Sequence, residues 1–135
     1  MKYLKFIIPI AVVIFLYGVY RYFFPTEEEK NKAINEFLGA GAFSQNYDNV
    51  TTATPVLSNA QIEVIGNEMN DVHGYFNDDE DKMFVCLRKI STIVDSCRVA
   101  RYMVGMNFLS PKDIISTYFS NDEIYRCQQI IKTYK

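Results

Sequence analysis

The feature that most constrains this chain is an apolar run at its amino terminus. Residues 6–20 carry no charge, and the run continues past Arg21 to Phe24. A helix of about twenty residues, rising about 1.5 Å per residue, crosses a hydrocarbon core of roughly 30 Å. The run therefore predicts a transmembrane anchor over residues 1–25. The residues predicted to form this anchor are Phe6, Ile7, Ile8, Val12, Val13, Ile14, Phe15, Leu16, Tyr20 and Arg21.

A cleaved secretory signal peptide is the alternative interpretation, because Lys2 and Lys5 form a basic start before the apolar run. Signal peptides have a shorter apolar region and end in small residues. Here the run ends in aromatic residues, which are typical of a span whose rings lie at the headgroup level. The pattern favours an uncleaved single span. The two lysines outnumber Arg21 on the far side, so the positive-inside rule predicts an inside amino terminus and an outside C-terminal domain.

The rest of the chain is long enough for one small domain rather than two. All 16 acidic residues follow the apolar run, where eleven lysines and arginines accompany them, so residues 26–135 have a formal charge near −5. Nucleic-acid binding requires a clustered basic surface. The charge balance therefore predicts that nucleic acid is not a partner.

The pattern divides this remainder into three parts and predicts an all-α fold. Residues 26–38 open with a capping-box pattern and predict a short juxtamembrane helix. Residues 39–57 lack periodicity and predict a linker. Residues 58–135 contain five helix-start signals, each followed by an apolar stripe at helical spacing, and predict a compact five-helix bundle. The predicted starts are Ser58, Asn77, Ser91 or Thr92, Ser110 and Ser120.

Two short stretches of this region match a known family. Residues 74–81 read GYFNDDED between the first two predicted helices, and residues 113–116 read DIIS near the end of the fourth. With these stretches and its five helices, segment 58–134 resembles an annexin-type repeat, whose first loop reads roughly G-x-G-T-D-E. Annexin repeats bind calcium, and through it phospholipid headgroups, by loop carbonyls and a distant carboxylate. Because Phe76 and Thr117 replace the second loop glycine and the acidic ligand, the resemblance implies the fold without the calcium activity.

The acidic run at the second predicted helix is a weak candidate for a metal site. It lacks the spacing of a calcium-binding loop, and consecutive carboxylates at a helix start point to different sides of the axis. Negative groups in a first turn complement the helix dipole by about 0.3–1 kcal/mol each. We therefore predict helix-start electrostatics, no metal and no cofactor. The residues of this run are Asp78, Asp79, Glu80 and Asp81.

Three cysteines, Cys86, Cys97 and Cys127, stand at unrelated spacings, and the single histidine is His73. A structural metal site needs closely spaced ligands, and a nucleophilic cysteine needs a neighbouring base. Each cysteine falls on an apolar stripe, which predicts buried free thiols. One disulfide with one free thiol is the alternative in an oxidising compartment. The sequence contains no catalytic motif that we could identify, and we predict that the protein is not an enzyme.

Arg98 and Arg101 lie on the polar face of the third predicted helix. They are candidate partner-binding residues for an acidic subunit, and solvated helix surface is the alternative. Together, the patterns predict a non-enzymatic, single-span structural or adaptor protein, bound to a lipid bilayer and to other subunits of a membrane-associated assembly such as a membrane-containing phage virion or an envelope complex. An annexin-like module for lipid headgroups or calcium, and a small membrane-perturbing factor of the lysis type, are the alternatives.

Overall fold

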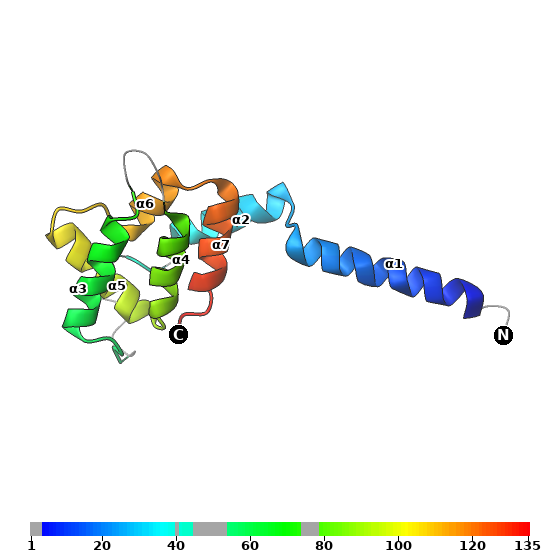
Figure 1. The fold of residues 1–135 in the computed structure, drawn as a ribbon, viewed down its shortest axis with the longest axis horizontal. Helices are drawn as coiled ribbons and strands as arrows, with labels where there is room; N and C mark the ends of the chain where they lie inside the picture. Colours follow the sequence, from blue (N-terminus) through cyan, green and yellow to red (C-terminus); the bar gives the residue numbers. More distant parts are fainter. Residues whose placement is uncertain (1–3, 40, 45–53, 74–78) are drawn as a thin grey trace.

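The computed structural model describes residues 4–39, 41–44, 54–73 and 79–135 (Figure 1). Within these residues the chain is all-helical, as the sequence predicted. The first helix, α1 (Leu4–Phe23), projects away from a globular part that the later helices form. These later helices are α2 (Glu27–Gly39), α3 (Asn59–Asn70), α4 (Glu80–Lys89), α5 (Ile93–Gly105), α6 (Pro111–Tyr118) and α7 (Asn121–Ile131).

The predicted transmembrane anchor over residues 1–25 is wrong. Among the residues that the structure describes, no helix combines the length and the apolar character that a membrane crossing requires. The uncharged run inside α1 is bounded by Lys5 and Arg21. Its length, at about 1.5 Å per residue, is about 22 Å and falls short of the roughly 30 Å hydrocarbon core. The predicted single-pass localisation, with its inside amino terminus and outside domain, is therefore corrected as well.

Three helices of the globular part begin at predicted capping serines. Ser58 and Ser120 each accept a hydrogen bond from the backbone N–H three residues later, and the side chains of Gln61 and Glu123 accept one in return. Ser110 precedes Pro111, the first residue of α6. Proline lacks an N–H, but the N–H of the first helical residue makes no bond within the helix, so none is lost. These local signals act within one turn, and for this reason they could be read from the sequence.

The starts of α4 and α5 refine the prediction. Thr92, rather than Ser91, caps α5, and its Oγ1 accepts the N–H of Asp95 at 3.1 Å. The predicted start at Asn77 lies outside the described residues. In the described part, Asp79 caps α4 and accepts the N–H of Lys82 at 3.0 Å.

The core of the globular part lies among α3, α4, α5 and α7, and Ile114 and Ile115 of α6 belong to the same buried cluster. α3 packs against α5 and α4, and α4 packs against α7. At the α3–α5 contact, a Cβ on Gly66 would lie 2.6 Å from Cδ1 of Tyr102, so the glycine permits this close approach. The completely buried apolar side chains include Met69, Val72, Met83, Leu87, Val99, Met103, Ile114 and Ile115.

The segment from α2 to residue 43 also packs on this core. α2 lies against α7, and Lys30 of α2 pairs with Asp122 at 2.6 Å. Phe43 is 2% exposed, and its N–H donates to Ser96 Oγ at 3.0 Å. Residues 39–57 were predicted to be a linker. Residues 40 and 45–53 of it lie outside the description, whereas Ala42 and Phe43 are part of the core.

A buried carboxylate connects the chain before α3 to α5. Asp95 is completely buried and accepts hydrogen bonds from the N–H groups of Val56 and Leu57, at 2.9 and 3.2 Å. It also accepts from Thr92 Oγ1 at 2.9 Å and from Arg98 at 2.7 Å. Burial alone raises the pKa of Asp95, but the hydrogen bonds from these four residues together hold it below its ordinary value.

The carboxyl terminus is part of the fold. Tyr134 is 8% exposed, and its hydroxyl donates to the Leu87 carbonyl at 2.7 Å. The Lys135 N–H donates to the Ser91 carbonyl, and the Lys135 carbonyl accepts from the N–H of Ile93 at the start of α5, at 3.0 Å each. The last residues therefore close the bundle between α4 and α5.

Candidate functional site

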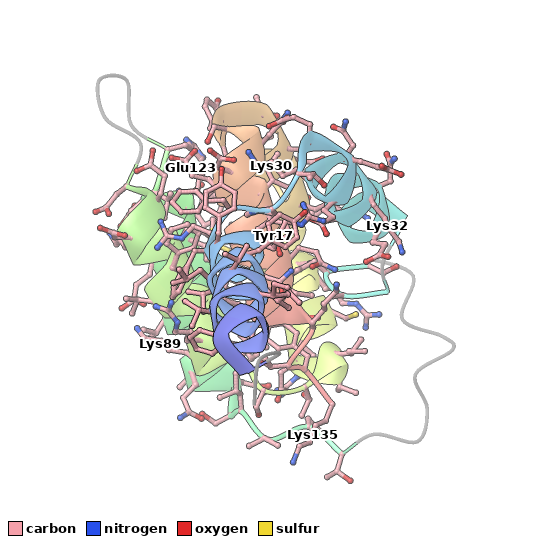
Figure 2. The ribbon with its side chains drawn as sticks, turned by 90° about the vertical axis from the view of Figure 1, so that its right-hand side faces the viewer. Tyr17, Lys30, Lys32, Lys89, Glu123 and Lys135 are labelled. Atoms are coloured by element: carbon pink, nitrogen blue, oxygen red, sulfur yellow. The ribbon has the colours of Figure 1, made fainter. Side chains whose placement is uncertain are left out.

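The largest exposed apolar surface among the described residues belongs to α1. Figure 2 looks along this helix toward the globular part, with Tyr17 in the foreground. The packed helix pairs of the described chain do not include α1. Its large apolar side chains are between 39% and 69% exposed, and they lie on all sides of the helix and just beyond its end. They are Ile10, Val12, Val13, Ile14, Phe15, Leu16, Tyr17, Val19, Tyr20, Phe23 and Phe24.

The area of this surface is large enough for a stable interface. An aromatic side chain presents about 150–250 Å², so the five exposed rings alone leave roughly 450–750 Å² in contact with solvent. Six aliphatic side chains add to this area. The largest apolar patch of a typical monomer is about 300–600 Å², and each partner in a standard interface contributes about 800 Å². By this comparison, the apolar surface of α1 exceeds the largest patch of a typical monomer.

A hollow interrupts the surface of α1 at Gly18. It has a volume of ≈ 430 Å³ and is lined by Phe15, Gly18, Val19 and Phe23. A Cβ placed on Gly18 would meet nothing within 4 Å. The sequence analysis did not assign a role to Gly18 or to Phe23. A glycine inside an otherwise apolar helix was the available signal, since glycine in a helix interior lowers its stability.

The junction between α1 and α2 is held by polar contacts. Arg21, at the end of α1, pairs with Glu29 of α2 at 3.0 Å, and the rings of Tyr20 and Phe24 stack with centroids 4.9 Å apart. Thr26 N–H donates to Glu29 Oε2 at 2.8 Å. This hydrogen bond is the main reason that the pKa of Glu29 is lowered. Burial opposes it, and the Thr26 hydroxyl and the Arg21 charge lower the pKa further. Arg21 therefore serves a contact within the chain.

A polar cleft of ≈ 580 Å³ lies where this junction meets α7. Its charged groups are paired with one another: Glu36 lies 4.0 Å from Lys32 and 3.6 Å from Lys132, and it also accepts a hydrogen bond from Gln128. Residues of α2 and α7 line the cleft, and both positive and negative side chains face the solvent in it. It therefore offers no single-sign site for a charged ligand.

The residues predicted to form the membrane anchor all lie in α1. Phe6, Ile7 and Ile8 are within the helix, but their side chains lie outside the description. The others from Val12 to Tyr20 are exposed, and Arg21 is half-buried at the junction. The prediction thus located the exposed apolar surface, although the assigned bilayer crossing is wrong.

The two predicted partner-binding arginines, Arg98 and Arg101, differ in their surroundings. Arg98 is 23% exposed and donates to Asp95, to the Leu57 carbonyl and to Asn59 Oδ1, at 2.6 to 2.7 Å. Its guanidinium therefore holds the segment before α3. Arg101 is exposed on the same helix and lines a cleft of ≈ 370 Å³ with Arg98 and Tyr102. Their roles in binding a partner stay a prediction.

The acidic run does not converge on a metal site in the described residues. Asp78 lies outside the description, Asp79 caps α4, and Glu80 and Asp81 occupy the first turn of that helix. Among the described side chains, no group of three histidine, cysteine or carboxylate ligands is placed to hold an ion. The observed cap agrees with the interpretation of this run as helix-start electrostatics.

The cysteines are free thiols and all three are buried, as the favoured interpretation predicted. Burial raises the pKa of Cys86 to about 12, with a further contribution from the Glu68 carboxylate, which accepts from its Sγ at 3.5 Å. Burial likewise raises the pKa of Cys127 to about 12. His73 stacks on Tyr118 with ring centroids 5.3 Å apart. The thiols of Cys86 and Cys127 are therefore protonated at neutral pH, and a thiol is a poor nucleophile.

Comparisons of the chain with protein-family models, with curated proteins and with solved structures found no match. The resemblance of residues 58–134 to an annexin-type repeat accordingly stays a prediction.

Proposed function

We propose that this protein is a non-enzymatic structural or adaptor subunit of a larger protein assembly. In this role α1 is buried against other protein subunits, and the globular part lies outside this contact and remains accessible to further partners. The observation that carries the proposal is the apolar surface of α1, which is exposed on every side of the helix.

The physical argument starts from the cost of this exposure. A helix that is apolar all round is ordinarily buried in the core of a large protein or spans a membrane, and no described helix meets the requirements of a span. Most helical stability in proteins comes from packing, so a single helix that projects into water lacks its main source of stability. Burial of α1 against apolar side chains of other subunits removes the exposed surface from water at about 25 cal/mol per Å².

The chemistry of the globular part supports an interaction role over a catalytic one. Its thiols are buried and two of them have a pKa of about 12. Its most deeply buried carboxylate, Asp95, already accepts hydrogen bonds from four residues of the chain itself. The charge near −5 over residues 26–135 supports protein contacts rather than nucleic acid.

Sedimentation velocity of the full chain in detergent-free buffer tests the proposal. We expect species heavier than one chain, because in a purified sample only other copies can cover α1. The double variant Ile14→Glu/Leu16→Glu places a charge on each of two opposite sides of α1, at residues that are 66% and 59% exposed. It is expected to sediment as a monomer with an unchanged circular dichroism transition of the globular part. Its matched control is Val64→Glu/Val85→Glu, which charges two residues of the globular part that are 54% and 51% exposed. This control is expected to associate like the parent.

Two results would contradict the proposal. The first is a parent chain that stays monomeric and soluble at micromolar concentration. The second is a chain that floats with phosphatidylcholine vesicles as a monomer while the Ile14→Glu/Leu16→Glu variant does not, since this would identify lipid rather than protein as the material that covers α1.

A further inference from the structure

Three exposed residues of α1 form one stripe with the spacing of a coiled-coil seam. Ala11, Ile14 and Gly18 are separated by three and then four residues, and all three are exposed. Apolar residues at alternating spacings of three and four meet a second helix along a left-handed pair. Two of the three are small, which lets two backbones come close together. The stripe is therefore shaped for another helix rather than for a flat surface.

The glycine in this stripe has no explanation within the described part of its own chain. Glycine in a helix interior is less favourable than alanine by about 0.8–1.0 kcal/mol. At Gly66 a close contact with Tyr102 requires glycine, but at Gly18 a Cβ would meet nothing within 4 Å. The hollow of ≈ 430 Å³ at Gly18, between Phe15 and Phe23, is correspondingly open to an external side chain.

We propose that α1 pairs antiparallel with α1 of a second copy, with Ala11 of each helix opposite Gly18 of the other. The inference rests on the proposed function, because it names the subunit that covers α1. In this register Ile14 and Phe15 lie at the centre of the pair, and the apolar parts of both helices overlap along their length. α1 projects clear of the globular part, so the two globular parts lie at opposite ends (Figure 1).

Charge selects the antiparallel direction. Residues 1–25 carry three positive charges, at Lys2, Lys5 and Arg21, whereas residues 26–135 have a formal charge near −5. An antiparallel pair brings the basic amino end of one helix to the acidic globular part of the other, near the glutamates that open α2 at Glu27. A parallel pair would instead place two acidic globular parts side by side. Opposite charges within about 10 Å attract at moderate ionic strength, and like charges repel.

The pairing leaves the other side of α1 available. Val13, Leu16 and Tyr20 lie on the helix face opposite the stripe and are 65%, 59% and 58% exposed. A dimer formed through the stripe therefore retains apolar surface for additional subunits. This arrangement is consistent with an adaptor that is itself a dimer.

Mixed-disulfide formation tests the register. Ala11→Cys and Gly18→Cys chains, one of them carrying a tag that changes its size, are mixed at equal concentration and oxidised. The native thiols are buried and do not compete. We expect the mixed disulfide to exceed each homodisulfide by at least tenfold. A mixture of Val13→Cys with Gly18→Cys is the matched control, because Val13 lies on the opposite face, and it is expected to give little cross-linking.

A second variant tests the hollow without disturbing the fold. Gly18→Leu fills the hollow and raises helix propensity, and its Cβ meets no atom of its own chain within 4 Å. We expect the dimer dissociation constant, measured by sedimentation equilibrium, to rise at least tenfold while the helical circular dichroism signal is kept or increased. Val13→Leu adds a larger side chain on the opposite face and is expected to change the constant less than threefold.

The outcomes separate this inference from the proposed function. Equal or predominant homodisulfides would show parallel pairing and would overturn the inference. Association of the parent chain without any Ala11–Gly18 cross-link would also overturn it, and the proposed function would stand. A parent chain that remains monomeric would overturn both.

Discussion

Two helices of this protein, α1 and α5, are both rich in apolar residues but differ completely in their surroundings. In α5 the side chains of Val94, Cys97, Val99, Ala100 and Met103 are at most 1% exposed. In α1 the large apolar side chains that the structure describes are between 39% and 69% exposed. The difference does not lie in helix formation, since both segments are helical. It lies in the neighbours: α5 is packed by α3 and by residues 41–43, and α1 projects into solvent.

The polar residues of the two helices explain part of this difference. α5 contains Asp95, Ser96 and Arg98, which bind the backbone of segments far away in the sequence. α1 has one described charged side chain, Arg21, and its ion pair with Glu29 reaches only to the next helix. Apolar packing is non-directional, whereas these hydrogen bonds specify which segments meet. The buried helix combines apolar packing with hydrogen bonds to distant segments, whereas the described contacts of α1 are confined to its junction with the next helix.

Matched leucine substitutions should show the largest contrast between the two regions. Leu87 is completely buried in the globular part, whereas Leu16 of α1 is 59% exposed. Leu87→Ala is expected to lower the free energy of unfolding by about 2–5 kcal/mol, because it removes buried apolar contacts and leaves a cavity. Leu16→Ala in the dilute monomer is expected to change it by about 0.5 kcal/mol or less. Urea denaturation followed by circular dichroism measures both, and equal effects would contradict the contrast.

Loss of the Asp95 charge should have the next largest effect. Asp95→Asn keeps the shape of the side chain but weakens the hydrogen bonds to Arg98 and to the N–H groups of Val56 and Leu57. Hydrogen bonds to a charged group contribute about 1.5–3 kcal/mol, so a loss of this order in the free energy of unfolding is expected. Asp79→Asn is the control, since Asp79 is an exposed cap and asparagine caps almost as well.

The same carboxyl gives a pH dependence of defined sign. The pKa of Asp95 is lowered in the folded chain, so the folded state binds its proton less readily than the unfolded state does. Its contribution to stability is therefore complete above the unfolded pKa of about 3.9 and is lost as the pH falls through the folded value. The difference in unfolding free energy between the parent and Asp95→Asn should shrink in this range. A difference that grows on acidification would contradict the assignment.

A smaller loss is expected from Tyr134→Phe. The variant keeps the buried ring and its edge contact with Phe43 but removes the hydroxyl that donates to the Leu87 carbonyl at 2.7 Å. A neutral hydrogen bond contributes about 0.5–1.5 kcal/mol, and the free energy of unfolding should fall by this amount. Tyr125→Phe in α7, a residue that is not fully buried, is the comparison. Equal effects of the two would argue against a closing role for the carboxyl terminus.

Calcium is expected to have the smallest effect. Phe76 and Thr117 stand where the annexin pattern requires a glycine and an acidic ligand, and no described cluster of ligands is placed to hold an ion. Isothermal titration of the full chain with calcium at micromolar concentration should give no saturable heat. Saturable binding would show that the departures from the annexin pattern do not abolish its metal site.

The helices of the globular part could be predicted because their signals are local. Ser58, Ser110 and Ser120 cap helices through contacts within one turn, and the apolar stripes have the period of the helix. The role of residues 41–43 could not be predicted in this way. Phe43 stands in a stretch without periodicity, and its burial depends on Ser96, more than fifty residues later.

The candidate site was predicted in part. The sequence identified α1 as the most apolar segment of the chain. The predicted bilayer crossing was wrong because its length included residues beyond Arg21, whereas the uncharged run ends before that residue. Arg98 was predicted to face a partner, because helical periodicity places it on a polar face. Its actual contacts, Asp95, Leu57 and Asn59, include residues about forty positions earlier, which periodicity cannot reveal.

The sequence by itself determined where the helices of this protein form and which of their faces are apolar, because caps, periodicity and charge act over a few neighbouring residues. Only the tertiary structure decided which apolar faces are covered. The stripes of α3, α4, α5 and α7 cover one another, and Asp95 and Tyr134 connect segments that are distant in the chain. α1 is left exposed, since burial requires a second surface and the described chain places none beside it.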